Sequence, residues 1–471
     1  MQRSTLVAIA ACGVAIVVMI LFMSGSQVKI QLAALIISAP LALALAWKRP
    51  AIFPYGCYAF LVPFDNLLML SNFGTGTKLL GLLAGAALLW WTIRRRVVVA
   101  PSRSLLVWAL LLGWMGLTLL WTSDPANGMR EFGSMLQILL LYAVVSVTPL
   151  ELKDFTWILR GIVGGGIAAA IFGIYVFHHQ NPIEAQLQHE FGRVTIVMGQ
   201  SAIDVNHFAN ALLLPIALLL VVALNEQRPT FKIAYILGLV AMIAAVYQTQ
   251  SREALLGFGA MLLYLAVVSR KRLQLIAVMV IGGVLVVVNP QMWQRFAEAT
   301  STGGAGRTSI WAVAIQALKH HFLFGSGLGS FANSYDEAYL QVFQRFSVGW
   351  SRDPHNLLIH YSVELGIAGA ALAVACWLLQ FRMMKTIAAG SQLWDMRIAA
   401  TAALVALSVT AMFIDLFTYK YVWLLFALIA QLRALAHVDP ELSAVHAVPP
   451  RRFDGDVTDL LWPNVTPSHA R

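Results

Sequence analysis

Apolar runs of about twenty residues recur along most of this chain, and they constrain its fold more than any other feature. As helices, such runs are long enough to cross a hydrocarbon core about 30 Å thick. Within lipid each span must satisfy its own backbone hydrogen bonds, which a helix does inside one segment. The alternating strands of an outer-membrane barrel are absent from the sequence. The chain is therefore predicted to be an all-α polytopic membrane protein.

Composition supports the same fold class. The 471 residues are 59% hydrophobic and 11% charged, whereas a soluble domain carries about 25% charged residues. Too little polar surface exists to cover a water-soluble globule. The three cysteines, Cys12, Cys57 and Cys376, lie inside separate apolar segments, so we interpret them as small buried side chains and not as a disulfide or metal framework. The net charge of +10 fits either basic cytoplasmic loops or an anionic ligand.

We expect about twelve transmembrane helices, within a range of twelve to fourteen. The run from Leu6 to Met23 is long for a signal peptide and has no A-x-A cleavage site, so it is predicted to be an uncleaved first span. Pro54 and Pro63 interrupt the third run. The candidate spans run approximately 6–23, 28–46, 51–70, 78–93, 104–121, 131–148, 157–178, 206–224, 231–249, 252–268, 273–289, 355–381, 397–416 and 420–436.

Orientation follows from short basic loops, which prefer the cytoplasm. A topology with both termini inside places four such loops there: Lys48-Arg49, Arg94-Arg95-Arg96, Arg270-Lys271-Arg272 and Arg382 to Lys385. We expect four regions: 1–289, a transmembrane bundle with a periplasmic segment at about 179–205; 290–354, a large periplasmic loop; 355–436, the C-terminal transmembrane helices; and 437–471, a disordered cytoplasmic tail.

The loop over 290–354 is predicted to fold into short helices over the membrane surface. Within it, Thr308 to His320 has an amphipathic pattern. The apolar face of this predicted helix comprises Ile310, Trp311, Ala314, Ile315 and Leu318.

Basic residues on the predicted periplasmic side are the first candidate site. They are Arg193, Arg252, Arg295, Arg307, Lys319, Arg345 and Arg352. Arg252 lies in a tight turn between two spans on the predicted periplasmic side. A basic residue in a short loop there is contrary to the positive-inside bias. It is either a snorkelling arginine paired with Glu253 or a phosphate-binding arginine, since a guanidinium offers a planar fork to phosphate oxygens.

His355 is the candidate general base. It follows Pro354 at the start of a predicted span, and an imidazole with a pKa near 6.5 suits proton transfer at neutral pH. The alternative is an ordinary interfacial histidine. Upstream, the glycines of Gly325-Ser326-Gly327-Leu328-Gly329 permit a tight turn, and no strand–helix unit surrounds them as a dinucleotide site would require.

Asp415 is a further candidate, because a carboxylate at the end of an apolar span is costly and usually functional or paired. Lys420 lies five residues on, so a structural ion pair between the two is the alternative. No D-x-D triplet suited to a metal-dependent sugar-nucleotide transferase is visible; the predicted periplasmic carboxylates are scattered at Asp204, Glu253, Asp336, Glu337 and Asp353. We expect neither a metal nor another cofactor.

Three motifs late in the chain resemble the C-terminal signature of the O-antigen ligase and polymerase superfamily, and among its members the O-antigen ligases most closely. They are G-R-x-x-x-W at Gly306–Trp311, G-x-G-x-G-x-F at Gly325–Phe331, and H-N-L-L … E-L-G-I-x-G at His355–Gly369. The resemblance is specific over these residues and looser over the multi-span architecture with its late loop.

This resemblance implies a GT-C-like membrane glycosyltransferase in the bacterial inner membrane. Its donor would be undecaprenyl-pyrophosphate-linked O-antigen and its acceptor the lipid A–core oligosaccharide. Membrane lipids are the other expected partners, and nucleic acid is not one. The family's functional positions carry over to His355, Arg307 and Arg252 as catalytic residues, and to Arg193, Asp415 and Asn356 as substrate-binding residues. We expect His207 to be an interfacial histidine.

The implied reaction is a metal-independent, inverting transfer. His355 would accept the proton of the acceptor hydroxyl while arginines neutralise the departing pyrophosphate. An O-antigen polymerase or a protein O-oligosaccharyltransferase would share this chemistry and differ in acceptor. A transporter or lipid flippase is the alternative from another class, but such proteins usually carry internal repeats and polar residues at the bilayer midplane.

Overall fold

The computed structural model describes residues 44–67, 69–70, 74–179, 193–198, 201–301, 306–345 and 349–443. The described chain is helical apart from two very short antiparallel hairpins, β1 with β2 and β3 with β4. The elements are η1 Ala51–Gly56, α3 Cys57–Leu61, η2 Val62–Leu67, β1 Met69–Leu70, β2 Gly74–Thr75, α4 Gly76–Arg95, α5 Arg103–Thr118, α6 Pro125–Val147, α7 Leu152–His179, β3 Val197–Met198, β4 Ser201–Ala202, α9 Val205–Ala211, α10 Leu213–Asn225, α11 Pro229–Gln248, α12 Arg252–Val268, α13 Arg272–Val288, α14 Pro290–Ser301, α15 Arg307–His320, α16 Phe331–Val342, α17 Leu357–Met384, α18 Trp394–Thr410, α19 Lys420–Val438 and α20 Pro440–Ser443.

Seven helical segments of the described chain are long and apolar enough to cross a membrane. They are α4, α6, α7, α9 with α10, α11, α17 and α19. An eighth span results if α13 and the first part of α14, which meet at a bend of 86°, count as one. The protein is therefore a helical, multi-pass membrane protein. The expected total of about twelve stays a prediction, because residues 6–23 and most of 28–46 lie outside the described residues.

The predicted span over 51–70 is wrong as a single regular helix. The chain passes instead from the π-helix η1 through α3 to the 3₁₀-helix η2. Pro54 lies inside η1, and Phe53 leaves helical geometry at φ −134° and ψ 126°. A proline lacks the N–H that would continue the helical ladder and clashes with the preceding turn, so the segment breaks where the prolines fall.

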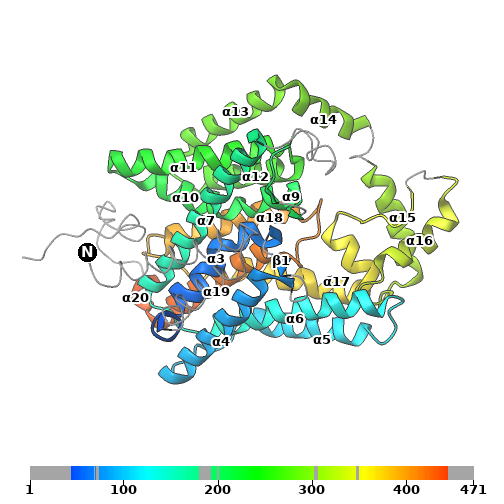
Figure 1. Ribbon diagram of the computed structural model, residues 1–471, viewed down its shortest axis with the longest axis horizontal. Coiled ribbons are helices and arrows are strands. Elements are labelled where there is room, and N and C mark those ends of the chain that lie inside the picture. Colours follow the sequence, from blue (N-terminus) through cyan, green and yellow to red (C-terminus); the bar gives the residue numbers. More distant parts are fainter. Residues whose placement is uncertain are drawn as a thin grey trace, which may run out of the picture.

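The core of the bundle lies around α18 and α19, which Figure 1 shows near the middle of the molecule. Trp108 of α5 is buried there against three aromatic rings, with its centroid 4.5 Å from that of Trp423, 5.1 Å from Phe417 and 5.7 Å from Phe426. Cys57 and Cys376 are both buried, as predicted from their apolar surroundings. At the edges of the view, α13 and α14 lie on one side and α15 and α16 on another (Figure 1).

The predicted amphipathic helix is α15, which begins at Arg307 and ends at His320. The face that it buries comprises Ile310, Val313, Ala314 and Ala317. These residues pack against Phe331, Tyr335, Ala338 and Tyr339 of α16 and against Val363 of α17. The predicted face is partly wrong, since Ile315 is 49% exposed. The tyrosine-rich face of α16 meets the small residues of α15, and this tertiary contact turns the buried stripe away from Ile315.

Helix α17 is broken at Gly366, where φ is 68° and ψ −177°. The turn that contains Gly325, Gly327 and Gly329, all at positive φ, packs into this break. Ser326 N donates to the Val363 carbonyl (2.9 Å) and Gly327 N to the Glu364 carbonyl (2.8 Å). A Cβ on Gly325 would lie 2.2 Å from the Glu364 carbonyl oxygen. The predicted glycine turn is thus confirmed, and it satisfies backbone groups that the helix break exposes.

Candidate functional site

Arg252 is the first residue of α12 and follows the tight turn that ends α11. It donates from Nη1 to the Arg295 carbonyl of α14 (2.7 Å). Arg295 in turn donates from Nη1 to Gln250 Oε1 in the same turn (3.3 Å). Helix α14 is thereby held over the start of α12. The guanidinium of Arg252 is half-buried between these elements and does not project freely toward solvent.

Arg307 is the first residue of α15 and lies opposite the start of α12. Its Nη1 is 3.9 Å from Glu253 Oε2, and their side chains are 17% and 3% exposed. The alternative that Glu253 would pair with Arg252 is therefore wrong in detail, since this carboxylate faces Arg307. Burial lowers the pKa of Arg307, Glu253 opposes this, and the nearby Arg252 lowers it further. The two guanidiniums thus lie close enough to share an electrostatic environment.

Arg193 reaches the same turn from a different segment. It donates from Nε to the Thr249 carbonyl (2.8 Å) and from Nη2 to Asn206 Oδ1 (3.0 Å). Asp204 caps the following helix, α9, by accepting from the backbone N–H groups of Asn206 and His207. The predicted early periplasmic segment therefore does approach Arg252, although residues 180–192 lie outside the described residues.

His355 lies just before α17 in a left-handed conformation, with φ 45°. Trp311 of α15 donates from Nε1 to the carbonyl of the preceding Pro354 (2.7 Å). The pKa of His355 is lowered, first by desolvation and then by the positive charge of Arg307, while Asp353 partly opposes these effects. The ring is therefore neutral at pH 7 and retains a lone pair that can accept a proton.

Asn356 is the N-cap of α17. Its Oδ1 accepts from the backbone N–H groups of Leu358 (3.0 Å) and Ile359 (3.1 Å), and its Nδ2 donates to the Met412 carbonyl (2.9 Å). The side chain is buried, so its hydrogen-bonding groups are used within the protein. The geometry gives Asn356 the task of fixing the backbone beside His355, and it leaves little of the amide for the predicted contact with substrate.

Asp415 faces His360, a residue that was not among those predicted from the sequence. Its Oδ2 is 3.2 Å from His360 Nδ1, and His360 Nε2 is 3.3 Å from Glu364 Oε1. The same Glu364 oxygen accepts from the backbone N–H of Phe331 (3.0 Å). Both ring nitrogens of His360 thus face carboxylates, an arrangement that a doubly protonated imidazolium satisfies, because it can donate from each nitrogen.

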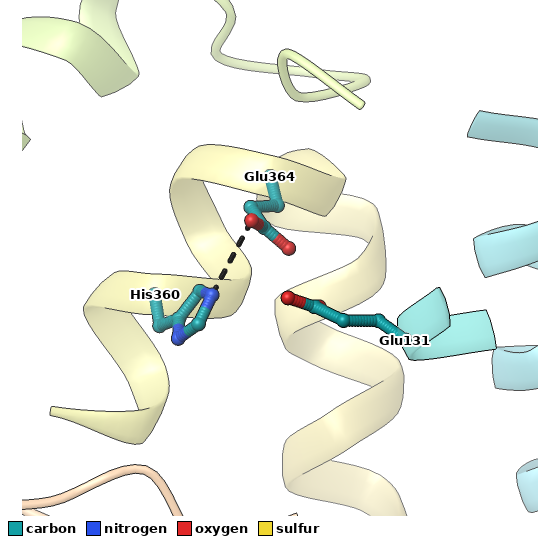
Figure 2. A group of neighbouring side chains, drawn as sticks. All are labelled: Glu131, His360 and Glu364. Atoms are coloured by element: carbon teal, nitrogen blue, oxygen red, sulfur yellow. Dashed lines mark ion pairs between the residues drawn. The ribbon is translucent and has the colours of Figure 1, made fainter. Parts of the chain in front are cut away.

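Glu131 of α6 completes this group. Figure 2 shows the carboxylates of Glu131 and Glu364 directed toward one another beside the His360 ring. Ligand atoms of these three residues all lie within 4.8 Å of one another, close enough to share one metal ion. Because both His360 nitrogens already face carboxylates, the geometry suits charge pairing better than coordination by nitrogen. We name Glu131, His360, Glu364 and Asp415 the acidic network.

The predicted alternative for Asp415, an ion pair with Lys420, is wrong. Lys420 is 6% exposed and its Nζ donates to Asp65, with further bonds to Thr75 Oγ1 (3.0 Å) and Thr77 Oγ1 (2.9 Å). Sequence proximity suggested the wrong partner, because Lys420 begins α19 and points toward η2 and α4 while Asp415 points toward α17.

The structure thus separates the predicted residues into two groups. Arg193, Arg252, Arg307 and His355 form what we name the arginine–histidine cluster, whereas Asp415 belongs to the acidic network. Two hydrogen bonds join the groups at the start of α17. The backbone N–H of Leu357 donates to the Ala411 carbonyl (3.0 Å), and the side-chain amide of Asn356 donates to the Met412 carbonyl. The i,i+4 spacing of His360 and Glu364 was the available signal for the network, but Glu131 comes from a distant helix that no local pattern links to them.

Comparisons with known proteins match the part of the chain that carries most of these residues. The family model described as O-antigen ligase matches residues 237–374, a region that includes Arg252, Arg307, His355 and Glu364. A protein from Pseudomonas aeruginosa named "O-antigen ligase" is 26% identical over 313 residues, which cover 64% of this chain and 70% of that protein. Together with the multi-pass helical fold, these matches show that the chain is similar to O-antigen ligases, most directly over residues 237–374.

Proposed function

We propose that this protein is an O-antigen ligase that transfers undecaprenyl-pyrophosphate-linked O-polysaccharide to lipid A–core oligosaccharide. The reaction would take place at the periplasmic face of the inner membrane, in lipopolysaccharide biosynthesis. The observation that carries the proposal is the arginine–histidine cluster. Three arginines from separate segments and one histidine with a lowered pKa meet where α11, α12 and α15 come together.

In this mechanism, the guanidiniums of Arg252 and Arg307, with Arg193, bind the pyrophosphate of the donor. A guanidinium matches phosphate oxygens with two parallel N–H donors and stays charged at all relevant pH values. As the bond between the anomeric carbon and the pyrophosphate oxygen breaks, negative charge grows on the leaving group. Fixed positive groups stabilise that charge by several kcal/mol in a site with little water, on the order of 3 kcal/mol for one donor.

His355 is the proposed general base. It accepts the proton of the acceptor hydroxyl while the hydroxyl oxygen forms its bond to the anomeric carbon, and a single displacement inverts that carbon. The hydrogen bonds of Trp311 to Pro354 and of Asn356 to Met412 hold the histidine's backbone on both sides. We propose that the arginines supply the positive charge that a divalent cation supplies in sugar-nucleotide transferases, so that the transfer is metal-independent.

The acidic network has a supporting role in this proposal. It connects α6 to the first turns of α17 and to the loop before α19, and Asn356, the N-cap of α17, is next to His355. Fixing this half-helix limits where the imidazole can lie. Asp415 thus acts on the reaction through the position of α17 and not by contact with the pyrophosphate.

Two related activities would use the same cluster with a different acceptor: an O-antigen polymerase, which joins two undecaprenyl-linked chains, and a protein O-oligosaccharyltransferase. A transporter or flippase is less well supported. The charged groups of the cluster gather at the ends of α11, α12 and α15, whereas alternating access needs a site near the middle of the bundle.

The test is reconstitution of the purified protein in liposomes with undecaprenyl-pyrophosphate-linked O-antigen and lipid A–core, with a chelator present. We expect a ladder of larger lipopolysaccharide on a gel. His355→Ala should abolish the ladder, whereas His320→Ala, an exposed histidine of α15, should leave it unchanged. Growth of the undecaprenyl-linked chain without ligation would assign the protein as a polymerase. Loss of the ladder on chelation would contradict the metal-independent mechanism.

A further inference from the structure

A cavity of about 430 Å³ lies between α4, α6 and the start of α19. Its apolar wall includes Tyr58, Ile138 and Leu141, and its polar groups include Lys78 in the first turn of α4 and Arg130 in the second turn of α6. The combination of an apolar wall between two spans and cations near the helix starts suits a molecule that is anchored in the bilayer and carries an anionic group.

The charges within the cavity leave two cations without a carboxylate partner among the described residues. Lys420, deeper in the cavity, is neutralised by its ion pair with Asp65. Lys78 Nζ has the Ser134 hydroxyl as its hydrogen-bond partner (3.4 Å), and Arg130 Nη2 has Asn127 Oδ1 (2.5 Å). Both are neutral oxygens, which a phosphate or carboxylate oxygen would displace as a stronger partner.

The cavity adjoins the acidic network, and the loop before α19 links it to the residue beside His355. Glu131 lines it and also belongs to the acidic network. Tyr419 lines it too, and this ring stacks on His207 with centroids 3.4 Å apart. His207, predicted to be interfacial, is 8% exposed at this contact. The loop that ends in Thr418 and Tyr419 is the one whose Met412 carbonyl binds Asn356, beside His355.

We propose that this cavity is the acceptor subsite, and that Lys78 and Arg130 bind an anionic group, phosphate or carboxylate, on the saccharide of the lipid-anchored acceptor. This inference rests on the proposed function, in which the arginine–histidine cluster binds the donor pyrophosphate. The Tyr58 and Tyr419 rings and the Ser134 hydroxyl and Gln137 amide provide the mixture of flat apolar faces and polar groups that a sugar needs.

The kinetic test uses Lys78→Gln and Arg130→Gln in the reconstituted ligation assay. A lost charge-assisted contact should raise the KM for lipid A–core about tenfold or more, with the KM for the donor and the kcat at saturating acceptor unchanged. Lys78→Arg should restore most of the affinity, since it retains the charge. Lys319→Gln is the matched control, because Lys319 is a cation on α15 that does not line this cavity.

A direct binding measurement separates this inference from the proposed function. Full-length His355→Ala protein in nanodiscs is titrated with lipid A–core, with lipid A–core from which phosphate has been removed, with phosphatidylglycerol, and with undecaprenyl pyrophosphate. We expect Lys78→Gln in this background to weaken binding of intact lipid A–core about tenfold and to leave undecaprenyl pyrophosphate binding unchanged.

Three results would overturn the inference. Weaker binding of undecaprenyl pyrophosphate in Lys78→Gln would assign the cavity to the donor and leave ligation itself intact. An equal loss of phosphatidylglycerol binding would make it a general lipid-headgroup site. Unchanged lipid A–core binding in both glutamine variants would exclude Lys78 and Arg130 from acceptor recognition. If the protein with all native residues binds no lipid A–core, the proposed function fails instead.

Discussion

His355 combines an unusual backbone conformation with a lowered pKa, and its immediate neighbours account for both. Trp311 and Asn356 hold the backbone on either side, while desolvation and Arg307 disfavour the imidazolium. Both effects lower the pKa of His355 and so favour the neutral imidazole. The sequence identified the residue through its motif and its place before a span, but Arg307, the charge that acts on it most strongly, comes from another helix.

The exposed Asp353 offers a test of this electrostatic balance. Its carboxylate raises the pKa of His355, so Asp353→Asn should lower that pKa further. In the proposed mechanism ligation requires the neutral imidazole, so its rate should fall as the pH drops through the His355 pKa. The acid limb of the kcat/KM profile should therefore move to lower pH, with little change at pH 8. Movement to higher pH would show that His355 is not the base.

Arg307 is predicted to act through its shape as well as its charge. Arg307→Lys keeps a cation near Glu253 but loses the planar fork that binds two phosphate oxygens at once. We expect ligation to fall about tenfold or more, with the loss in the donor KM or kcat and not in the acceptor KM. Arg345→Lys, an exposed arginine beyond α16, is the matched control. Full activity in Arg307→Lys would show that this residue contributes only its positive charge and not the planar shape of its guanidinium.

At the scale of elements, the break in α17 explains why a glycine-rich turn and a glycine-containing helix occur together. Gly366 adopts φ 68°, and a Cβ there would lie 2.2 Å from the Leu323 carbonyl oxygen. Ile367 N donates to the Phe322 carbonyl (2.9 Å), and Trp114 of α5 donates to that of Leu365 (2.9 Å). The unpaired backbone groups of the break are therefore taken up by α5 and by the turn after α15, which ties the α15–α16 layer to the bundle.

Gly366→Ala should destabilise the protein, because an alanine at φ 68° and ψ −177° costs about 1–3 kcal/mol before any clash is counted. The backbone contact at Leu323 adds to that cost, so we expect a clearly lower midpoint of thermal unfolding in detergent and a partial loss of ligation. Gly113→Ala in α5 is the control, since a Cβ there meets nothing within 4 Å. Equal stability of the two variants would contradict the role given to the break.

At the scale of the whole molecule, one topology should place the entire site on one side of the membrane. Cysteines introduced at positions 252 and 355, in a background without native cysteines, should react with an impermeant maleimide from the periplasmic side. A cysteine at position 95, at the end of α4 where basic residues gather, should react only from the cytoplasmic side. Labelling of 252 and 355 from opposite sides would contradict the enzyme proposal.

The chain beyond α20 is predicted to be dispensable. Deletion after Ser443 keeps every residue of the arginine–histidine cluster, the acidic network and the α4–α6 cavity. The truncated protein should insert and ligate at a rate within about twofold of the full chain, by the same gel ladder. The magnitude is small because terminal segments of a chain usually tolerate change. Loss of ligation in a stably inserted truncation would give the tail a function.

The sequence by itself determined that this chain is a helical membrane protein and which short motifs carry its family resemblance, because both properties are local. An apolar run long enough to cross lipid has few conformations other than a membrane-spanning helix. A glycine turn, or a histidine before a span, can be recognised from a few residues. Arg252, Arg307 and His355 could be selected in this way.

Only the tertiary structure decided which side chains are partners. Lys420 lies near Asp415 in the chain but binds Asp65, whereas Asp415 binds His360, and Glu131 joins them from another helix. The same holds for Glu253, which faces Arg307 and not its neighbour Arg252. A charged side chain buried among helices pairs with the opposite charge that packing brings within a few ångströms. In a chain of many packed helices, that partner usually lies far away in the sequence.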